Sequence, residues 1–257
     1  MKLLSFSFLR PAALLCVLVI IFATSTHQRV YSRLWHEPLD VVIYPINGDD
    51  TLETHNYIQS LTDSHFTEID EWMSREAKRY DLVQSRPLRT RLGAQVKSHP
   101  PLLPENNDLL PTIWWGLKLR WWVWRQTPDS QSNLRRIRVF VSFRSEATNL
   151  PHSVGLQKGL IGVVHAFSLD SQTSQNNIVI AHEILHTVGA TDKYGFSGQP
   201  RFPVGYANPL RSPLHPQRYA EIMAGKIPTS NFSSYMAESL KSTRINDITA
   251  AEIAWTD

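Results

Sequence analysis

The sequence predicts a mixed α+β domain in which helices pack on a twisted sheet. Short β-branched apolar runs such as Leu39–Ile46 have the pattern of buried strands, whereas Thr51–Tyr80 has apolar residues at helical spacing. Segments of the two kinds alternate along the chain from Leu39 onward. The composition, 42% hydrophobic and 19% charged, is that of a folded globular protein, and one domain is expected.

The first predicted strand, Leu39–Ile46, is almost continuously apolar and ends at the turn sequence Asn47–Asp50. This pattern is typical of a buried central strand. Thr51–Tyr80 then predicts one or two helices, with a break near Thr62–Ser64. Lys97–Pro111 contains four prolines among polar residues and predicts an extended connection within the domain.

A second helix is predicted at about Leu109–Arg125. One face of it is apolar and aromatic, with Leu110, Ile113, Trp114, Leu117, Trp121 and Trp124 at helical spacing. We expect this face to lie on the sheet. The alternative is that Trp115 and Trp122, beside Lys118, Arg120 and Arg125, rest on a membrane interface.

Two further strands complete the predicted sheet. Arg136–Ser142 alternates in the manner of a strand, and Gly159–Phe167 is a short apolar run. Gly162 within the second run indicates a bulge or a close backbone approach.

Charge and cysteine content exclude several classes of function. The chain has 26 lysines and arginines against 23 aspartates and glutamates, a net charge of +3 without a basic block. Nucleic acid is therefore not an expected partner. Cys16 is the only cysteine, which excludes an intramolecular disulfide and a cysteine-ligated metal. Any metal site must use His, Asp or Glu.

An apolar segment near the N-terminus predicts targeting. Lys2 and Arg10 precede the uncharged, almost wholly apolar run Pro11–Ala23, which is the order found in signal sequences. We expect residues 1–30 to act as an uncleaved anchor, a single membrane-spanning helix with the rest of the chain outside the cytoplasm. The alternative is cleavage, which would give a secreted or periplasmic protein.

The segment Asn176–Tyr194 carries the expected chemistry. Its apolar residues predict a buried helix that contains His182, Glu183 and His186 as HExxH. The histidines are one helical turn apart, so both imidazoles point to one side at a separation that suits a tetrahedral metal ion. Burial of these polar groups without a partner would be unfavourable, which supports a metal there.

Two residues beyond the pentapeptide extend the pattern to HExxHxxGxxD. Gly189 can end the helix in a left-handed conformation and turn the chain back toward the metal. Asp192 stands six residues after His186, and aspartate is a competent zinc ligand.

This longer pattern resembles the zinc-binding motif of the metzincin metallopeptidases, in the snapalysin-like variant that ends in aspartate. The resemblance implies one catalytic Zn²⁺ on His182, His186 and Asp192, with Glu183 as the general base. It also implies a twisted mixed sheet, an active-site helix and a small C-terminal subdomain closed by a helix. The upper subdomain would span residues 39–189 and the lower one residues 190–257.

The resemblance extends to the methionine turn that lies beneath the metal in this clan. Met223 stands in the segment Ala220–Gly225, and Ile248–Trp255 afterwards predicts a short closing helix. Several members of the clan have a tyrosine two residues past the methionine that stabilises the transition state, but Gly225 occupies that position here. Tyr194, Tyr206 or Tyr219 would have to replace it, and Tyr194 is the candidate next to the motif.

The resemblance also suggests how substrate binds. Gly159–Phe167 would be the edge strand that pairs with an extended substrate, through Gly159, Leu160, Ile161, Gly162 and Val163. The whole chain is also similar to small membrane-anchored bacterial zincins, a likeness that bears on localisation rather than substrate.

The expected activity is therefore zinc-dependent hydrolysis of peptide bonds in a protein or peptide substrate, by a monomer. Two alternatives stay open. One is a membrane-tethered binding protein that zinc stabilises, and the other is a hydrolase of a non-peptide amide such as a cell-wall component. The third ligand is open as well, because Glu221, Glu238 or Glu252 could serve in place of Asp192.

Overall fold

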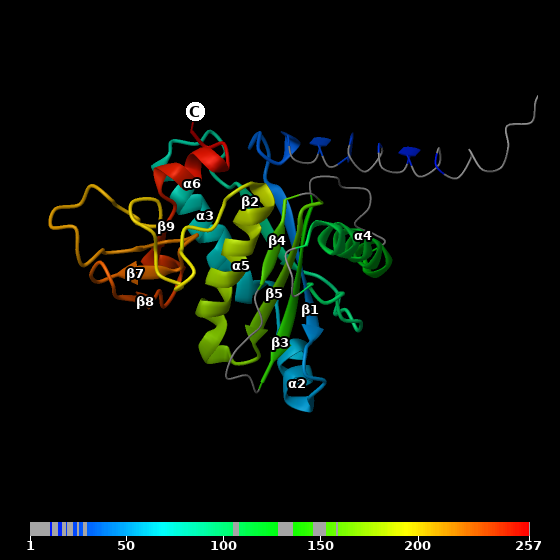
Figure 1. Ribbon diagram of the computed structural model, residues 1–257. Coiled ribbons are helices and arrows are strands. Elements are labelled where there is room, and N and C mark those ends of the chain that lie inside the picture. The colour runs from blue at the N-terminus through cyan, green and yellow to red at the C-terminus, as the bar shows by residue number, and fades with distance from the viewer. Residues whose placement is uncertain are drawn as a thin grey trace, which may run out of the picture.

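The computed structural model describes residues 30–104, 108–127, 136–145, 153–157 and 159–256, together with scattered positions from 11 to 27. In these residues a five-stranded, mostly parallel sheet is combined with five α-helices (Figure 1). The mixed architecture confirms the α+β class.

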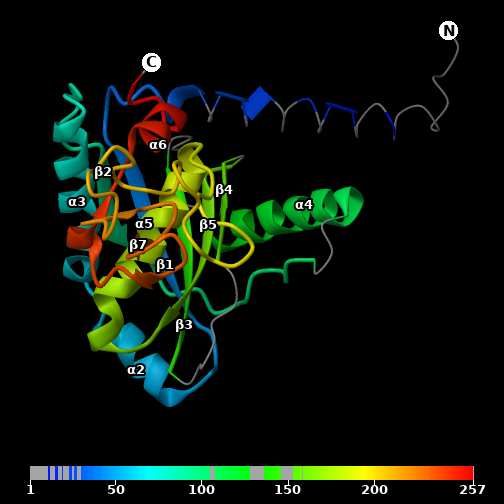
Figure 2. The same cartoon turned by 60° about the vertical axis from the view of Figure 1, so that its left-hand side comes forward.

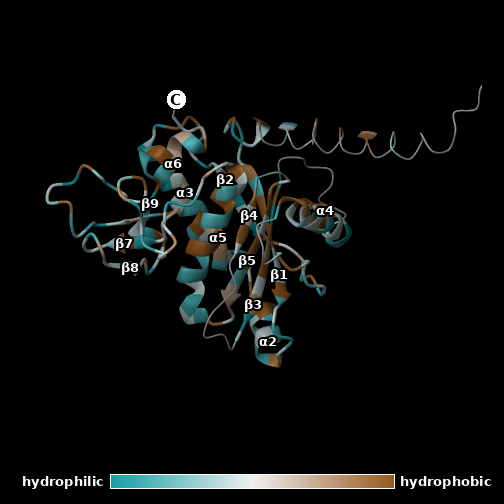
Figure 3. Ribbon diagram, viewed as in Figure 1, coloured by the Kyte–Doolittle hydropathy of each residue, from teal (hydrophilic) through white to brown (hydrophobic). Residues whose placement is uncertain are grey.

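The main sheet is built around two long buried strands. Its members are β1 (Leu39–Asn47), β2 (Leu88–Leu92), β3 (Ile137–Arg144), β4 (Val154–Leu156) and β5 (Ile161–Phe167). Their order is β2-β1-β3-β5-β4, with β4 antiparallel to β5 and the other neighbours parallel. Hydrophobic residues follow the central strands (Figure 3). The prediction of a buried central strand from Leu39 is therefore confirmed.

Helices cover both faces of the sheet (Figure 1). They are α2 (Leu52–Ser60), α3 (Thr67–Arg79), α4 (Leu109–Gln126), α5 (Thr173–Val188) and α6 (Asp247–Glu252), with 3₁₀ turns at Asp63–Phe66, Asp170–Gln172 and Leu240–Ser242. α3 and α5 share the main core with the sheet, whereas α4 packs in a second cluster against Phe140 and Ile161. The predicted break near Thr62–Ser64 is confirmed as the turn between α2 and α3.

The chain after α5 has little regular structure. It contains the short strands β6 (Ala220–Glu221), β7 (Lys226–Pro228), β8 (Ser234–Met236) and β9 (Thr243–Arg244), followed by α6. β6 pairs with β9 in parallel and β7 with β8 antiparallel. Ile222, Met223 and Ile253 are buried in the same core cluster as the sheet. The division into upper and lower subdomains at residue 189 stays a prediction.

The expected orientation of α4 is wrong. Trp115, Leu119, Trp122 and Val123 face the protein, whereas the aromatic face predicted for the core is largely exposed. Apolar residues lie on most sides of this helix, so their periodicity could not select the inward face. The inward side also offers acceptors to the indole N–H groups. The Nε1 of Trp115 donates to the carbonyl oxygen of Pro101 and that of Trp122 to Oγ of Ser98, both at 2.9 Å. The two tryptophans assigned to a membrane interface are thus packed inside.

The expected membrane anchor is also corrected. Among the described residues, no helix combines the length and the apolar character needed to cross a bilayer. α4 is long enough, at 18 residues, but it carries Lys118, Arg120 and Arg125, which a bilayer core disfavours. Residues 1–30 lie largely outside the described positions. The expectation of a single spanning helix with the catalytic domain outside the cytoplasm is therefore not carried further.

Asp49 connects the ends of two strands to the first helix. Its carboxylate accepts hydrogen bonds from the backbone N–H of Ser145 at 2.7 Å, from the backbone and hydroxyl of Thr51, and from the hydroxyl of Thr54. Burial alone would raise the pKa of Asp49. These hydrogen bonds outweigh it and hold the pKa well below its usual range.

We expect Asp49→Asn to destabilise the protein by about 2 kcal/mol near neutral pH, because charge-assisted bonds across three segments are lost. The folded-state pKa is depressed, so this stabilisation is present above the unfolded carboxyl pKa of about 4 and disappears as pH falls below it. Urea unfolding at neutral and acid pH measures both effects.

Asp50→Asn is the matched control, since the Asp50 side chain is 86% exposed. It should leave the free energy of unfolding almost unchanged. Equal stability of the two variants at neutral pH would contradict the role assigned to Asp49.

Candidate metal centre

α5 holds the HExxH residues on a helix that is fixed at both ends. Near its start, the side-chain amide of Asn176 bonds both the N–H and the carbonyl oxygen of Phe167, and Asn177 donates to the carbonyl oxygen of His65. At its end, Gly189 has φ 116° and its N–H bonds back to the carbonyl oxygen of His186. The predicted left-handed helix end at Gly189 is confirmed.

His182 and His186 on α5 come together with Asp192, which follows the helix. Nε2 of His182 lies 3.1 Å from Oδ1 of Asp192, and Nε2 of His186 lies 3.2 Å from the same oxygen. The imidazole centroids are 4.7 Å apart. One donor atom from each of the three residues falls within 4.8 Å of the others, and this group could hold a metal ion.

Backbone carbonyls orient both imidazoles. Nδ1 of His182 lies 3.1 Å from the carbonyl oxygen of Ile222, and Nδ1 of His186 lies 2.8 Å from that of Ala190. A carbonyl oxygen only accepts, so these contacts assign the proton to Nδ1 in each ring. In the neutral ring, Nε2 then carries the lone pair on the side of the cluster, as in a histidine that binds a metal ion.

The charges of the cluster favour a cation between its donors. Burial disfavours the charged form of His182, but the hydrogen bond that its Nε2 makes to Asp192 and the nearby Glu183 carboxylate together raise the pKa of this imidazole. Burial would raise the pKa of Asp192, yet the two histidines hold it well below its usual range. The carboxylate of Asp192 is thus a charged, available ligand.

Glu183 lies inside the protein beside the histidines. The residue is 4% exposed, and its Oε2 has no hydrogen-bond partner among the described residues. Burial raises its pKa, although the neighbouring histidines oppose the shift. A buried carboxyl group with a raised pKa next to a candidate metal site is suited to accept and return a proton.

The segment around Met223 forms a tight turn against α5. The N–H groups of Ala224 and Gly225 both bond the carbonyl oxygen of Glu221 at 2.9 Å, and Met223 is fully buried. The carbonyl oxygen of Ile222, within this turn, is the one that orients His182. The turn therefore contacts the first histidine of the cluster through its backbone.

Tyr194 lies at the rim of the cluster. Its ring is stacked with that of His182 at a centroid distance of 6.5 Å, and the residue is 38% exposed. Burial and the Asp192 carboxylate raise the pKa of Tyr194 to about 12. Its hydroxyl therefore keeps its proton at neutral pH and can donate a hydrogen bond. Tyr206 instead contacts His215, with its hydroxyl 2.9 Å from Nε2 of that residue.

The loop that carries Asp192 is held by a buried ion pair that sequence reasoning missed. Nζ of Lys193, a residue only 2% exposed, lies 2.6 Å from Oε2 of Glu252. Glu252 also accepts from the backbone and the hydroxyl of Thr191, at 2.9 and 2.7 Å. The residues on either side of Asp192 are thus tied to α6. Lys193 and Glu252 are 59 residues apart in sequence, so no local sequence pattern could predict that they pair.

The same contacts bear on the alternative third ligands. Glu252 is engaged with Lys193, and Glu221 is fully buried and accepts a hydrogen bond from Thr249. Among the described residues, the cluster that could hold a metal contains Asp192 and none of Glu221, Glu238 or Glu252.

The predicted substrate-binding edge strand is wrong. Gly159 and Leu160 precede β5 with positive φ values, and Ile161, Gly162 and Val163 lie within β5. β5 pairs with β3 on one side, and on the other side β4 pairs with Ile161–Val163, so these three residues do not lie at a free edge. The edge is β4, a strand of three residues that includes Gly155 and is too short to stand out in the sequence.

Gly155 lets β4 approach α5 closely. A Cβ atom at this position would lie 2.5 Å from Cβ of His186, 2.6 Å from the carbonyl oxygen of Glu183 and 3.0 Å from its Oε2. Only glycine fits such a contact without movement of the strand or the helix. The outer strand of the sheet therefore lies directly beside Glu183.

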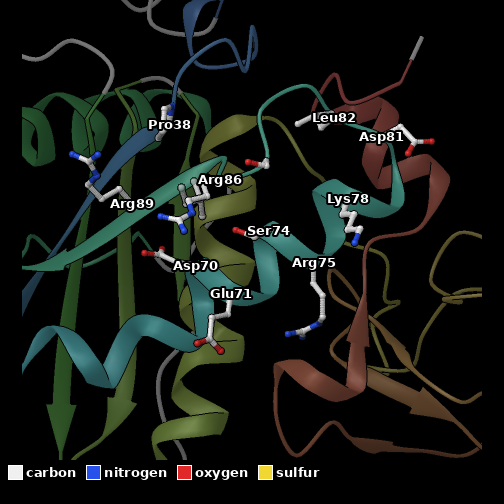
Figure 4. Close-up of a pocket in the computed structure, with 12 residues that line it drawn as sticks. Pro38, Asp70, Glu71, Ser74, Arg75, Lys78, Asp81, Leu82, Arg86 and Arg89 are labelled. Atoms are coloured by element: carbon white, nitrogen blue, oxygen red, sulfur yellow. The ribbon is translucent and has the colours of Figure 1, made fainter.

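A pocket of about 880 Å³ lies away from this cluster, along α3 and the segment before β2 (Figure 4). Its walls carry charges of both signs, from Asp70 and Glu71 to Arg75 and Arg86. Asp70 already accepts hydrogen bonds from the backbone and hydroxyl of Thr90. The pocket shares no residue with the His-His-Asp cluster and indicates no particular ligand.

Comparison of the chain with protein-family models finds no match, and comparison with curated proteins finds none. The case for a function therefore depends on the site itself.

We expect Glu252→Gln to weaken metal binding about tenfold or more, because loss of the charge releases Lys193 and the loop that presents Asp192. Competition with a chelating dye measures the affinity. The effect should be much smaller in an Asp192→Asn background, since Glu252 acts through that ligand.

Asp247→Asn, on the same helix but bonded to Tyr80 rather than to the loop, is the matched control and should not alter metal affinity. An equal loss of affinity from Glu252→Gln with and without Asp192 would show that the ion pair has no specific effect on this ligand.

We expect Gly155→Ala to reduce the free energy of unfolding by about 1–3 kcal/mol, because the added methyl group overlaps α5. Gly116→Ala provides the contrast. Its Cβ in α4 meets only a flexible arginine atom at 4.0 Å, and the substitution should stabilise the helix by about 0.5–1 kcal/mol. Denaturant unfolding compares the two, and a stabilising effect of both substitutions would refute the close contact.

Proposed function

We propose that this chain is a zinc-dependent metallopeptidase. The observation that carries the proposal is the convergence of His182, His186 and Asp192 with the buried Glu183 beside them. A purely structural metal site would need the three ligands but not an adjacent buried carboxylate. Glu183 is therefore the residue that argues for catalysis rather than for stabilisation alone.

The donor set fits zinc. Two imidazole nitrogens and one carboxylate oxygen are ligands that Zn²⁺ accepts, with one tetrahedral position left for water in a catalytic site. Mg²⁺ and Ca²⁺ prefer oxygen ligands throughout. The carbonyl contacts at Nδ1 of both histidines leave Nε2 on the side of the cluster, and the depressed pKa of Asp192 keeps its carboxylate charged.

Bound zinc would acidify a water molecule and polarise a substrate carbonyl group. The protein supplies the proton transfers. Glu183, buried and with a raised pKa, accepts a proton from the attacking water and returns it to the leaving amine. Tyr194, which stays protonated at neutral pH, is placed at the rim to donate a hydrogen bond to the developing oxyanion.

We also infer a metzincin-like fold from the order of the parts. A mostly parallel sheet with an antiparallel outer strand precedes α5, which carries HExxH. The left-handed Gly189, the cluster residue Asp192, the turn at Met223 and the closing helix α6 follow in that order. These features support the assignment, and a protein or peptide is the substrate class it implies.

We expect Glu183→Gln to retain one equivalent of zinc in the full-length protein while hydrolysis of a quenched-fluorescent peptide library falls by about 10²–10⁴-fold. His186→Ala should lose the metal, because one of three ligands is removed. Elemental analysis and the peptide assay, applied to the same preparations, separate binding from catalysis.

Glu53→Gln, an exposed carboxylate on α2, is the control and should keep both zinc and activity. Folded wild-type protein that binds no zinc would refute the proposal. Bound zinc with no hydrolysis of peptides would favour the binding protein or the non-peptide amidase.

A further inference from the structure

α4 presents an exposed apolar face on the opposite side of the sheet from α5 (Figure 1). Six large hydrophobic residues on it are each 51–77% exposed, namely Leu109, Leu110, Ile113, Trp114, Trp121 and Trp124. Leu102, in the segment whose Pro101 bonds Trp115, is 92% exposed. A monomeric protein seldom leaves so many large apolar side chains together on one helix, so this surface indicates a binding role.

The face cannot be removed from solvent by rotation of the helix. The opposite side is fixed against the sheet by Trp115, Leu119 and Trp122, and both buried indoles have hydrogen-bond acceptors. α4 also projects sideways from the body of the molecule (Figure 2). The exposed face is therefore a fixed feature of the surface.

The charge of α4 is of one sign. It contains Lys118, Arg120 and Arg125 and no acidic residue. Nζ of Lys118 lies 5.5 Å from the ring centroid of Trp114, and Cζ of Arg125 lies 5.0 Å from that of Trp121. Each of these cations is thus held beside an exposed indole. This pairing of tryptophan with lysine or arginine is typical of helices that lie in the headgroup region of a bilayer.

We propose that this face of α4 binds an anionic lipid surface, with the helix lying in the plane of the interface. The three indoles would enter the boundary between headgroups and acyl chains, and Lys118 and Arg125 would contact the phosphates. A second copy of the chain is a poorer partner, because two such helices would bring like charges together. Contact of this kind requires no spanning helix.

The position of α4 determines how the protein would be oriented on a membrane. α5 and the His-His-Asp cluster lie on the other side of the sheet from α4 (Figure 1). Lipid bound at α4 would therefore leave the cluster facing away from the surface. The inference does not depend on hydrolysis and would hold for a metal-binding protein without catalysis.

Tryptophan fluorescence of the full-length protein tests the proposal. Of the eight tryptophans, Trp114, Trp121 and Trp124 are exposed, while Trp35, Trp72, Trp115, Trp122 and Trp255 are at most 8% exposed. The apolar run at residues 11–23 contains no tryptophan. Vesicles of equal parts phosphatidylcholine and phosphatidylglycerol, with brominated acyl chains, should therefore quench emission only if α4 enters the bilayer.

We expect quenching with the anionic vesicles. Binding to pure phosphatidylcholine, or at high salt, should be at least about tenfold weaker, because the attraction of Lys118 and Arg125 to lipid phosphates needs anionic lipid and is screened by salt. Trp121→Gln with Trp124→Gln should weaken binding at least about tenfold, since each substitution removes apolar area that the bilayer would bury. Phe232→Gln with Leu210→Gln, which removes two exposed side chains elsewhere, is the matched control.

Lys118→Glu with Arg125→Glu gives a second variant that keeps the tryptophans and should also weaken binding to anionic vesicles at least about tenfold. Vesicle binding without tryptophan quenching would assign the interaction to another segment and overturn the proposal. Self-association of the protein without lipid, lost in the tryptophan variant, would overturn it as well by making a second copy the partner.

Discussion

The burial of two histidines and a glutamate on α5 is the constraint on which the surrounding structure depends. Each imidazole needs an acceptor at Nδ1, and the backbone supplies it from Ile222 for His182 and from Ala190 for His186. Two separate parts of the chain after α5 must therefore pass within hydrogen-bond distance of the helix. The turn around Met223 and the loop after Gly189 supply these two acceptors from residues that lie in neither a helix nor a strand.

The sheet separates two different kinds of surface. On the side of α5, polar side chains converge in a partly buried cluster whose charges favour a cation. On the side of α4, apolar side chains project outward with cations among them. The parallel strands between them are buried on both faces, which makes them a rigid spacer. A ligand at one surface thus need not compete with a ligand at the other.

Sequence reasoning predicted the elements whose patterns are strong and local. The strand from Leu39, the break between α2 and α3, and the left-handed end of α5 at Gly189 are confirmed. β2 and β4 were missed, because alternating arginines in one and a length of three residues in the other weaken the strand pattern. The orientation of α4 depended on packing and on hydrogen-bond acceptors at Ser98 and Pro101, in the segment before the helix. The Lys193–Glu252 pair depended on tertiary contact. Neither is encoded in local periodicity.

The contacts of α6 join residues further apart in sequence than those of the His-His-Asp cluster. The side chain of Arg33 donates to the carbonyl oxygen of Glu252 across 219 residues, and Nε1 of Trp35 donates to that of Ile253 across 218. Loop-closure entropy must be overcome before contacts of such separation form. Because Glu252 fixes the residues that flank Asp192, the complete ligand set matures only when these distant segments have met. Metal occupancy would then serve as a reporter of finished folding, with partly folded chains held in a low-affinity state.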